Sequence, residues 1–189
     1  MSEMSKRLML KVSGLQVAGW SRRGALSAAV ALSLGLLPAV GPYAGDRREA
    51  PPNMGGYCVT SFQLVGQTPE GTLISRLTGE CVLRHLGQTT LEALQYITPK
   101  EDGSLELDDY ATFTAANGDT LQANFKGIAE YTSPASVSFT GTEIFLNGGT
   151  GRFTTASGSV EIEGTATFTS ETGGIGEFTM YPGTITYKR

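Results

Sequence analysis

The stretch Leu105–Tyr131, LELDDYATFTAANGDTLQANFKGIAEY, decides the fold because apolar and polar residues alternate along both of its halves. In the second half, the odd positions from 121 to 131 hold apolar residues or glycine, whereas the even positions are mostly polar. A period of two is typical of a strand with one buried face and one wet face. Asn117-Gly118, between the halves, predicts a hairpin with a type I′ turn.

The same pattern recurs along the C-terminal two thirds of the chain. The 25 glycines of the whole chain, together with the many threonines and the few long helix formers of this part, favour strands over helices here. Eight such strands can close a barrel that is filled by side chains or holds one small ligand. We therefore predict an all-β domain over residues 57–189, an eight-stranded antiparallel closed barrel. Its strands are expected near residues 59–66, 78–84, 88–97, 105–115, 120–131, 136–147, 158–169 and 176–188.

Residues 1–45 have a different composition from the rest of the chain. Ser21-Arg22-Arg23 precedes an uncharged, largely apolar stretch over residues 24–40. A basic region followed by an apolar core is typical of a twin-arginine export signal, here with cleavage near Ala44. Residues 46–56 then form a polar linker. We expect an exported protein, periplasmic or extracellular.

Two alternatives for the N-terminal segment stay open. It could be an uncleaved membrane anchor, although its 17 uncharged residues fall short of the roughly 20 that a span needs. It could also be a hydrophobic helix that is retained as a lid over the barrel mouth of a cytoplasmic enzyme. In the mature exported form we expect no stable membrane span.

Charge separates the two parts of the chain as well. Residues 1–45 carry five basic groups and one acidic group, a net +4, which leaves −8 for residues 46–189. Nucleic acids and anionic membrane surfaces reward clustered lysine and arginine, so an acidic barrel argues against both as partners.

Cys58 and Cys81 fall on the first two predicted strands, which would be neighbours. A disulfide between them is plausible if the protein is exported, and two buried thiols are the alternative. One histidine and no Cys-x-x-Cys motif argue against a metal site.

Asp109 and Glu143 are the most informative polar residues. Strict alternation places each on the apolar face of its strand, where burial would raise the pKa of a carboxyl group and prepare it for proton transfer. The alternative is that both lie at the barrel rims, or that a bulge reverses the register.

His85, the only histidine, is a further candidate base, or else a side chain that stabilises a turn. With no serine or cysteine nucleophile near it in sequence, a serine hydrolase is disfavoured. A larger set of aromatic and apolar residues is expected to line the lumen and contact a substrate: Phe113, Phe125, Tyr131, Phe139, Phe145, Phe178 and Met180.

Three short motifs carry a family resemblance. Gly148-Gly149-Thr150-Gly151-Arg152-Phe153, with Ala156 and Gly158 after it, resembles a turn that enters a late strand in the allene oxide cyclase and dirigent-like barrel superfamily. His85-Leu86-Gly87 and Ala116–Asp119 are similar to elements of its bacterial exported members. The resemblance covers about Tyr57 to Lys188. It implies an apolar barrel that controls ring closure, as in spirotetronate and spirotetramate [4+2] cyclases, without a metal or an organic cofactor.

The leading functional hypothesis is a cofactor-free cyclase or isomerase that folds a hydrophobic, polyene- or polyketide-like substrate in the lumen. The alternative is an exported, non-catalytic barrel that binds a small apolar ligand or serves a structural role in the envelope. Subunit association through exposed positions such as Ile128 and Ile144 stays open.

Overall fold

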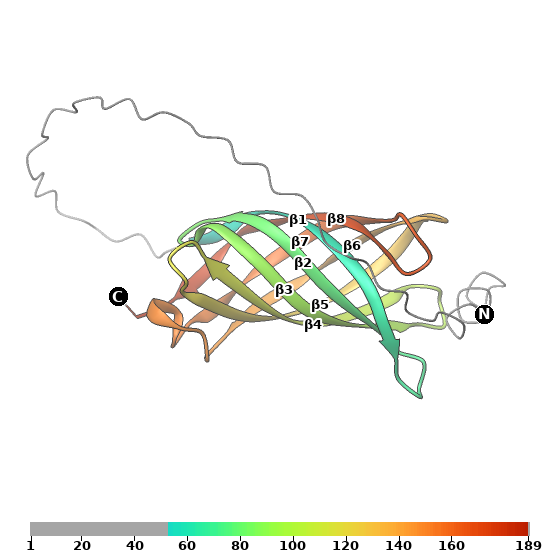
Figure 1. The fold of residues 1–189 in the computed structure, drawn as a ribbon, viewed down its shortest axis with the longest axis horizontal. Helices are drawn as coiled ribbons and strands as arrows, with labels where there is room; N and C mark the ends of the chain where they lie inside the picture. Colours follow the sequence, from blue (N-terminus) through green and yellow to red (C-terminus); the bar gives the residue numbers. More distant parts are fainter. Residues whose placement is uncertain (1–52, 189) are drawn as a thin grey trace, which may run out of the picture.

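The computed structural model describes residues 53–188, which form one closed antiparallel barrel (Figure 1). Each strand pairs with the next, and the last returns to pair with the first. The predicted barrel is thus confirmed. The predicted export signal or lid helix lies outside the described residues. The eight strands are β1 (Asn53–Gln67), β2 (Leu73–Leu83), β3 (Gly87–Pro99), β4 (Leu105–Ala115), β5 (Thr120–Ser133), β6 (Ser136–Leu146), β7 (Ser157–Phe168) and β8 (Gly173–Thr186).

The strand boundaries differ from the expected ones mainly at β1 and β2. β1 begins at Asn53, which pairs with Thr184, so residues 53–56 belong to the barrel and not to the linker. β2 begins at Leu73, five residues before the expected start. There the apolar Ile74 faces outward and the polar Ser75 faces inward, the reverse of the apolar-in, polar-out pattern of the other strands. The first part of β2 is therefore not recognisable as a strand from its sequence.

Three hairpins share one turn geometry, at Thr68–Thr72, Lys100–Ser104 and Ala115–Asp119. In each, the fourth residue is a glycine with positive φ, 84° at Gly118, and its amide donates to the carbonyl of the first residue. This is a three-residue loop, a type I turn closed by a left-handed glycine. The expected type I′ turn is therefore wrong, because Gly118 alone has positive φ there and Asn117 does not.

Apolar side chains point into the barrel, and small residues make room for the larger rings. A Cβ on Gly127 would lie 2.5 Å from Cζ of Phe125, and one on Gly164 would lie 2.4 Å from Cζ of Phe139. Both approaches are closer than any real contact, so these rings lie directly against the bare backbone of the wall. Phe139 makes edge-to-face contacts with Phe125 and Phe178.

One end of the barrel, here called the plugged end, is closed by the loop between β6 and β7. This loop contains η2 (Gly151–Phe153), a 3₁₀ helix that places the fully buried Phe153 over the lumen. The ring of Phe153 packs edge-to-face on Tyr187, near the C-terminus marked in Figure 1. Arg152 stacks over both rings and donates to the main-chain carbonyl of His85. Arg152 thus ties the loop between β6 and β7 to the turn between β2 and β3.

The opposite end, here called the open end, carries the turns at residues 68–72, 100–104, 134–135 and 169–172. Its lumen-facing residues Phe62, Leu77 and Phe168 are only partly buried, and Phe62 and Phe168 make an edge-to-face contact there. The lumen is therefore less completely covered at this end than at the plugged end. Within residues 53–188 no helix has the length and apolar character to cross a bilayer.

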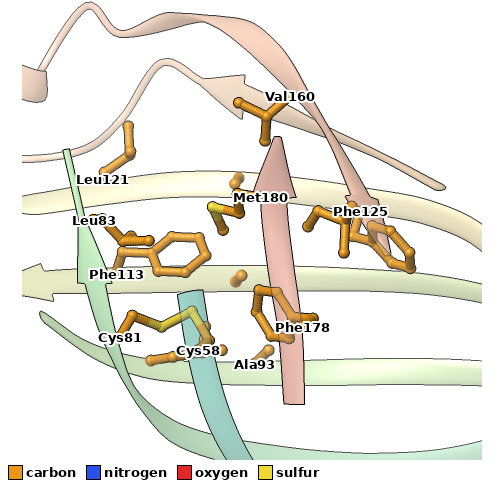
Figure 2. Packing of buried hydrophobic residues seen from close by; sticks show 14 of the residues in the cluster. Cys58, Cys81, Leu83, Ala93, Phe113, Leu121, Phe125, Val160, Phe178 and Met180 are labelled. Carbon is orange, nitrogen blue, oxygen red and sulfur yellow. A yellow bond between two sulfur atoms is a disulfide. The ribbon is translucent and has the colours of Figure 1, made fainter. Parts of the chain in front are cut away.

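Cys58 and Cys81 are paired across β1 and β2 and form a disulfide. Both face inward, and Figure 2 shows the bond among apolar side chains below Phe113. The alternative of two buried thiols does not hold in this structure, in which no described cysteine is free. Such a bond persists in an oxidising compartment. Export stays a prediction.

We expect the double variant Cys58→Ala/Cys81→Ala to lower the free energy of unfolding by about 3 kcal/mol or more. A loop of this size restricts the unfolded chain by that amount in the chain-entropy model, and the buried sulfur atoms add packing. Urea unfolding under non-reducing conditions measures the change. Equal stability of the variant and the native protein would show that the bond does not hold the barrel together.

A candidate acid–base site in the barrel lumen

An internal cavity of about 90 Å³ lies in the lumen toward the open end. It exists because small residues meet on neighbouring strands: Ala93 pairs with Ala111 across β3 and β4. Its wall is almost entirely apolar. Four polar side chains interrupt this wall, those of Thr60, Gln95, Asp109 and Glu143.

Asp109 lies in the middle of β4, on the lumen face, and is 7% exposed. The Nε2 of Gln95, its partner on β3, lies 3.4 Å from Oδ2 of Asp109. Burial raises the pKa of Asp109 to about 7, while the Gln95 amide and the main chain of Phe125 oppose that shift and the charge of Asp108 adds to it. Near neutral pH this carboxyl group therefore exists in both protonation states.

Glu143 lies on β6, also facing the lumen, and is 3% exposed. Its Oε1 is buried without a hydrogen-bond partner among the described residues. Burial raises the pKa of Glu143 well above its usual value, and the nearby charge of Asp109 raises it further. Because an ionised carboxylate without partners is costly in an apolar site, the lumen favours the neutral form of Glu143.

The register places the two acids on one row of the barrel wall. Asp109 pairs with Phe125 on β5, which pairs with Glu143 on β6. Strands lie about 4.8 Å apart, so the two Cα atoms are roughly 10 Å apart along the wall, and both side chains turn into the same cavity. The predicted inward placement holds, and neither a rim position nor a reversed register applies.

The row continues to residues that the sequence reasoning missed. Gln95 pairs with Asp109 on one side and with Ser75 on the other. Ser75 is fully buried and its hydroxyl has no hydrogen-bond partner among the described residues, although it does not line the cavity. Gln95 was detectable, since it takes an apolar position in the run Leu91, Ala93, Gln95, Ile97; Ser75 was not, because β2 was predicted too short.

His85 is not part of this site. It lies in the turn between β2 and β3 at the plugged end, with a positive φ of 68°. Its Nδ1 and Nε2 lie 3.2 Å from the Tyr187 hydroxyl and from the Asn53 carbonyl oxygen, respectively. The structure therefore gives His85 the role of a turn-stabilising side chain and separates it from the two acids.

The expected lumen-lining residues divide into two groups. Phe113, Phe125, Phe139 and Phe178 line the cavity as predicted. Phe145 and Met180 are buried but pack in the solid core outside the cavity lining. Tyr131 is 44% exposed, because β5 projects beyond the wall there, next to an irregularity in its pairing with β6. Tyr131 is thus not a lumen residue.

The site is composed of carboxyl, amide and hydroxyl groups and carries no positive side chain in its lining. Within residues 53–188 no three metal-ligating side chains gather at one place. What the arrangement offers chemically is proton exchange and hydrogen bonding in a dry, apolar environment.

Comparison with family models, with curated proteins and with solved structures finds no match for this chain.

We expect Asp109→Asn to gain stability relative to the native protein as the pH rises. The folded-state pKa of Asp109 lies above its ordinary 3.8, so its contribution to stability is full below about pH 4 and is lost as the pH rises through about 7. Between pH 5 and pH 8 the pH crosses about two units of this pKa difference. The free energy of unfolding of Asp109→Asn should therefore rise by about 2 to 3 kcal/mol relative to that of the native protein. Urea unfolding of both proteins at these two pH values measures it.

Glu92→Gln is the matched control, because Glu92 lies on β3 and faces solvent. Its stability difference from the native protein should be the same at both pH values. A difference for Asp109→Asn that does not change with pH would contradict the raised pKa of Asp109.

Proposed function

We propose that this protein is a cofactor-free isomerase or cyclase that acts on a small apolar molecule held in the barrel lumen. The observation that carries the proposal is the pair of buried carboxyl groups that face one apolar cavity, one of them with an unpartnered oxygen. Burial of such groups opposes folding, so a protein that only needed a stable barrel would gain from apolar side chains at both positions. A ligand with a hydrogen-bonding group would supply the missing partner.

Catalysis in this proposal has two parts. The rigid wall confines a flexible molecule in a reactive conformation, which lowers the entropic part of the barrier. A neutral carboxyl group polarises a carbonyl oxygen of the substrate, and it does so strongly because the lumen excludes water. The resemblance to the allene oxide cyclase-like barrels stays a prediction, in agreement with this chemistry.

The size of the cavity limits the substrate. Pockets that enclose drug-sized ligands measure about 300–1,000 Å³, whereas this one measures about 90 Å³. The enclosed space thus suits a small molecule, or the reacting segment of a longer one whose remainder extends through the open end. A polyene-like substrate would require Phe62 and Phe168 to move aside.

A second candidate is an exported, non-catalytic barrel that binds a small apolar ligand. The dense packing of phenylalanine side chains around a small cavity favours it, as does the disulfide. The two candidates differ in one respect: only the first requires the carboxyl groups themselves.

We expect Ala111→Leu, which fills the cavity between Asp109 and Phe113, to abolish binding of small cyclic ketones and enones. Ligand-observed NMR of the native protein and the variant measures binding. The control is Thr112→Val, on the outward face of the same strand.

The Glu143→Gln variant should still bind the ligand but should lower any turnover by about 100-fold or more. Full turnover by Glu143→Gln would overturn the role of Glu143, and binding without any turnover by the native protein would favour the non-catalytic barrel. Binding unaffected by Ala111→Leu would contradict a lumen site.

A further inference from the structure

The two lumen acids occupy different environments, and this difference is informative. Asp109 has the Gln95 amide beside one of its oxygens, whereas Oε1 of Glu143 has no partner among the described residues. A donor beside a carboxylate favours its ionised form, and a dry, unpartnered position favours the neutral acid. Asp109 is therefore the group that ionises first, with a pKa of about 7, and Glu143 keeps its proton.

A pair of acids whose environments separate their ionisation in this way is the usual composition of an acid–base site. The ionised member can accept a proton, and the neutral member can donate one. In this barrel Phe125 lies between Asp109 and Glu143 on the wall, and both acids line the same cavity. A small molecule in the cavity can thus contact both groups at once.

The lining also restricts the charge of the ligand. It contains two acids and no lysine, arginine or histidine, so an anionic ligand would lack a counter-charge in an apolar space. A neutral carbonyl group fits better, since its oxygen accepts a hydrogen bond from a neutral carboxyl group.

Building on the proposed function, we propose that the substrate is a small neutral ketone or enone, that Glu143 donates a proton to its carbonyl oxygen, and that ionised Asp109 removes a proton from the adjacent carbon. Gln95 is a positioning residue, which holds the Asp109 carboxylate toward the cavity.

The proposed step balances without any co-reactant. The C–H bond next to the carbonyl breaks, its proton passes to Asp109, and its electron pair forms a C=C bond. The carbonyl oxygen takes the proton of Glu143 and becomes an enol hydroxyl. In the reverse direction Glu143 recovers its proton from the enol hydroxyl, and Asp109 returns its proton to carbon. Return to the original carbon restores the ketone. In an enone, return to the far end of the conjugated system shifts the C=C bond.

Charge is conserved inside the lumen during this step. One of the two acids is ionised before the transfer, and the other is ionised after it. The apolar wall therefore never has to accommodate a second negative charge, which would be costly there. The same enol, held folded by the wall, could attack an electrophilic carbon of its own molecule, which connects this step with the proposed ring closure.

Solvent deuterium exchange tests this assignment. The full-length oxidised protein is incubated in D₂O with cyclopentanone, a small symmetric ketone, and ¹H NMR follows the loss of the protons next to the carbonyl. We expect exchange above the protein-free rate, and we expect that excess to fall about 100-fold or more in both Asp109→Asn and Glu143→Gln. The control Thr112→Val should exchange at the native rate.

The pH dependence separates the roles of the residues. Exchange should rise with pH through about 7 as Asp109 ionises. Gln95→Leu removes the amide that favours the ionised form, so it should move this rise to higher pH; a merely structural role for Gln95 would lower the rate without moving the profile.

Two failures can be told apart. Cyclopentanone that binds in the lumen but exchanges no faster than in buffer, or that exchanges equally in Asp109→Asn, would overturn the acid–base assignment and leave the proposed lumen site standing. Absence of binding by cyclopentanone and by small enones would contradict the assignment and the proposed function together.

Discussion

Closure of the sheet is the constraint on which the rest of this structure depends. Because β8 returns to pair with β1, each strand has two neighbours and every second side chain must enter one common lumen. Residues far apart in sequence, such as Asp109 and Glu143, are then brought to the same space by strand register alone. The plugged end and the disulfide hold this arrangement, whereas the lumen-facing rings at the open end, Phe62 and Phe168, are only partly buried.

Within this enclosure, two carboxyl groups have properties that they would not have in water. The apolar wall disfavours their charge and raises both pKa values. The Gln95 amide distinguishes the two groups, so that one of them can serve as a base while the other remains an acid. The proposed enolisation uses these two carboxyl groups and the hydrogen bond from Gln95.

Much of this could be predicted from the sequence, because alternation with a period of two fixes both the strand and the face of each residue. It placed Asp109 and Glu143 on the apolar faces of their strands and Cys58 and Cys81 on neighbouring strands, which made a lumen site and a disulfide two of the open alternatives. It failed where tertiary context overrides the pattern: Ser75 interrupts the inward face of β2, and Tyr131 lies where β5 extends past the wall. The position of His85 at the plugged end depends on a loop contact with Arg152, which no local pattern encodes.

The most direct test of the central claim is an NMR titration of ¹³C-labelled aspartate and glutamate carboxyl groups in the oxidised protein. The signals of Asp109 and Glu143, assigned from their amide variants, should change at about pH 7 and at a pH well above the usual glutamate value, respectively. Titration of both signals near pH 4, together with the other carboxyl groups, would show that water reaches them. That result would contradict a dry lumen and the acid–base chemistry inferred from it.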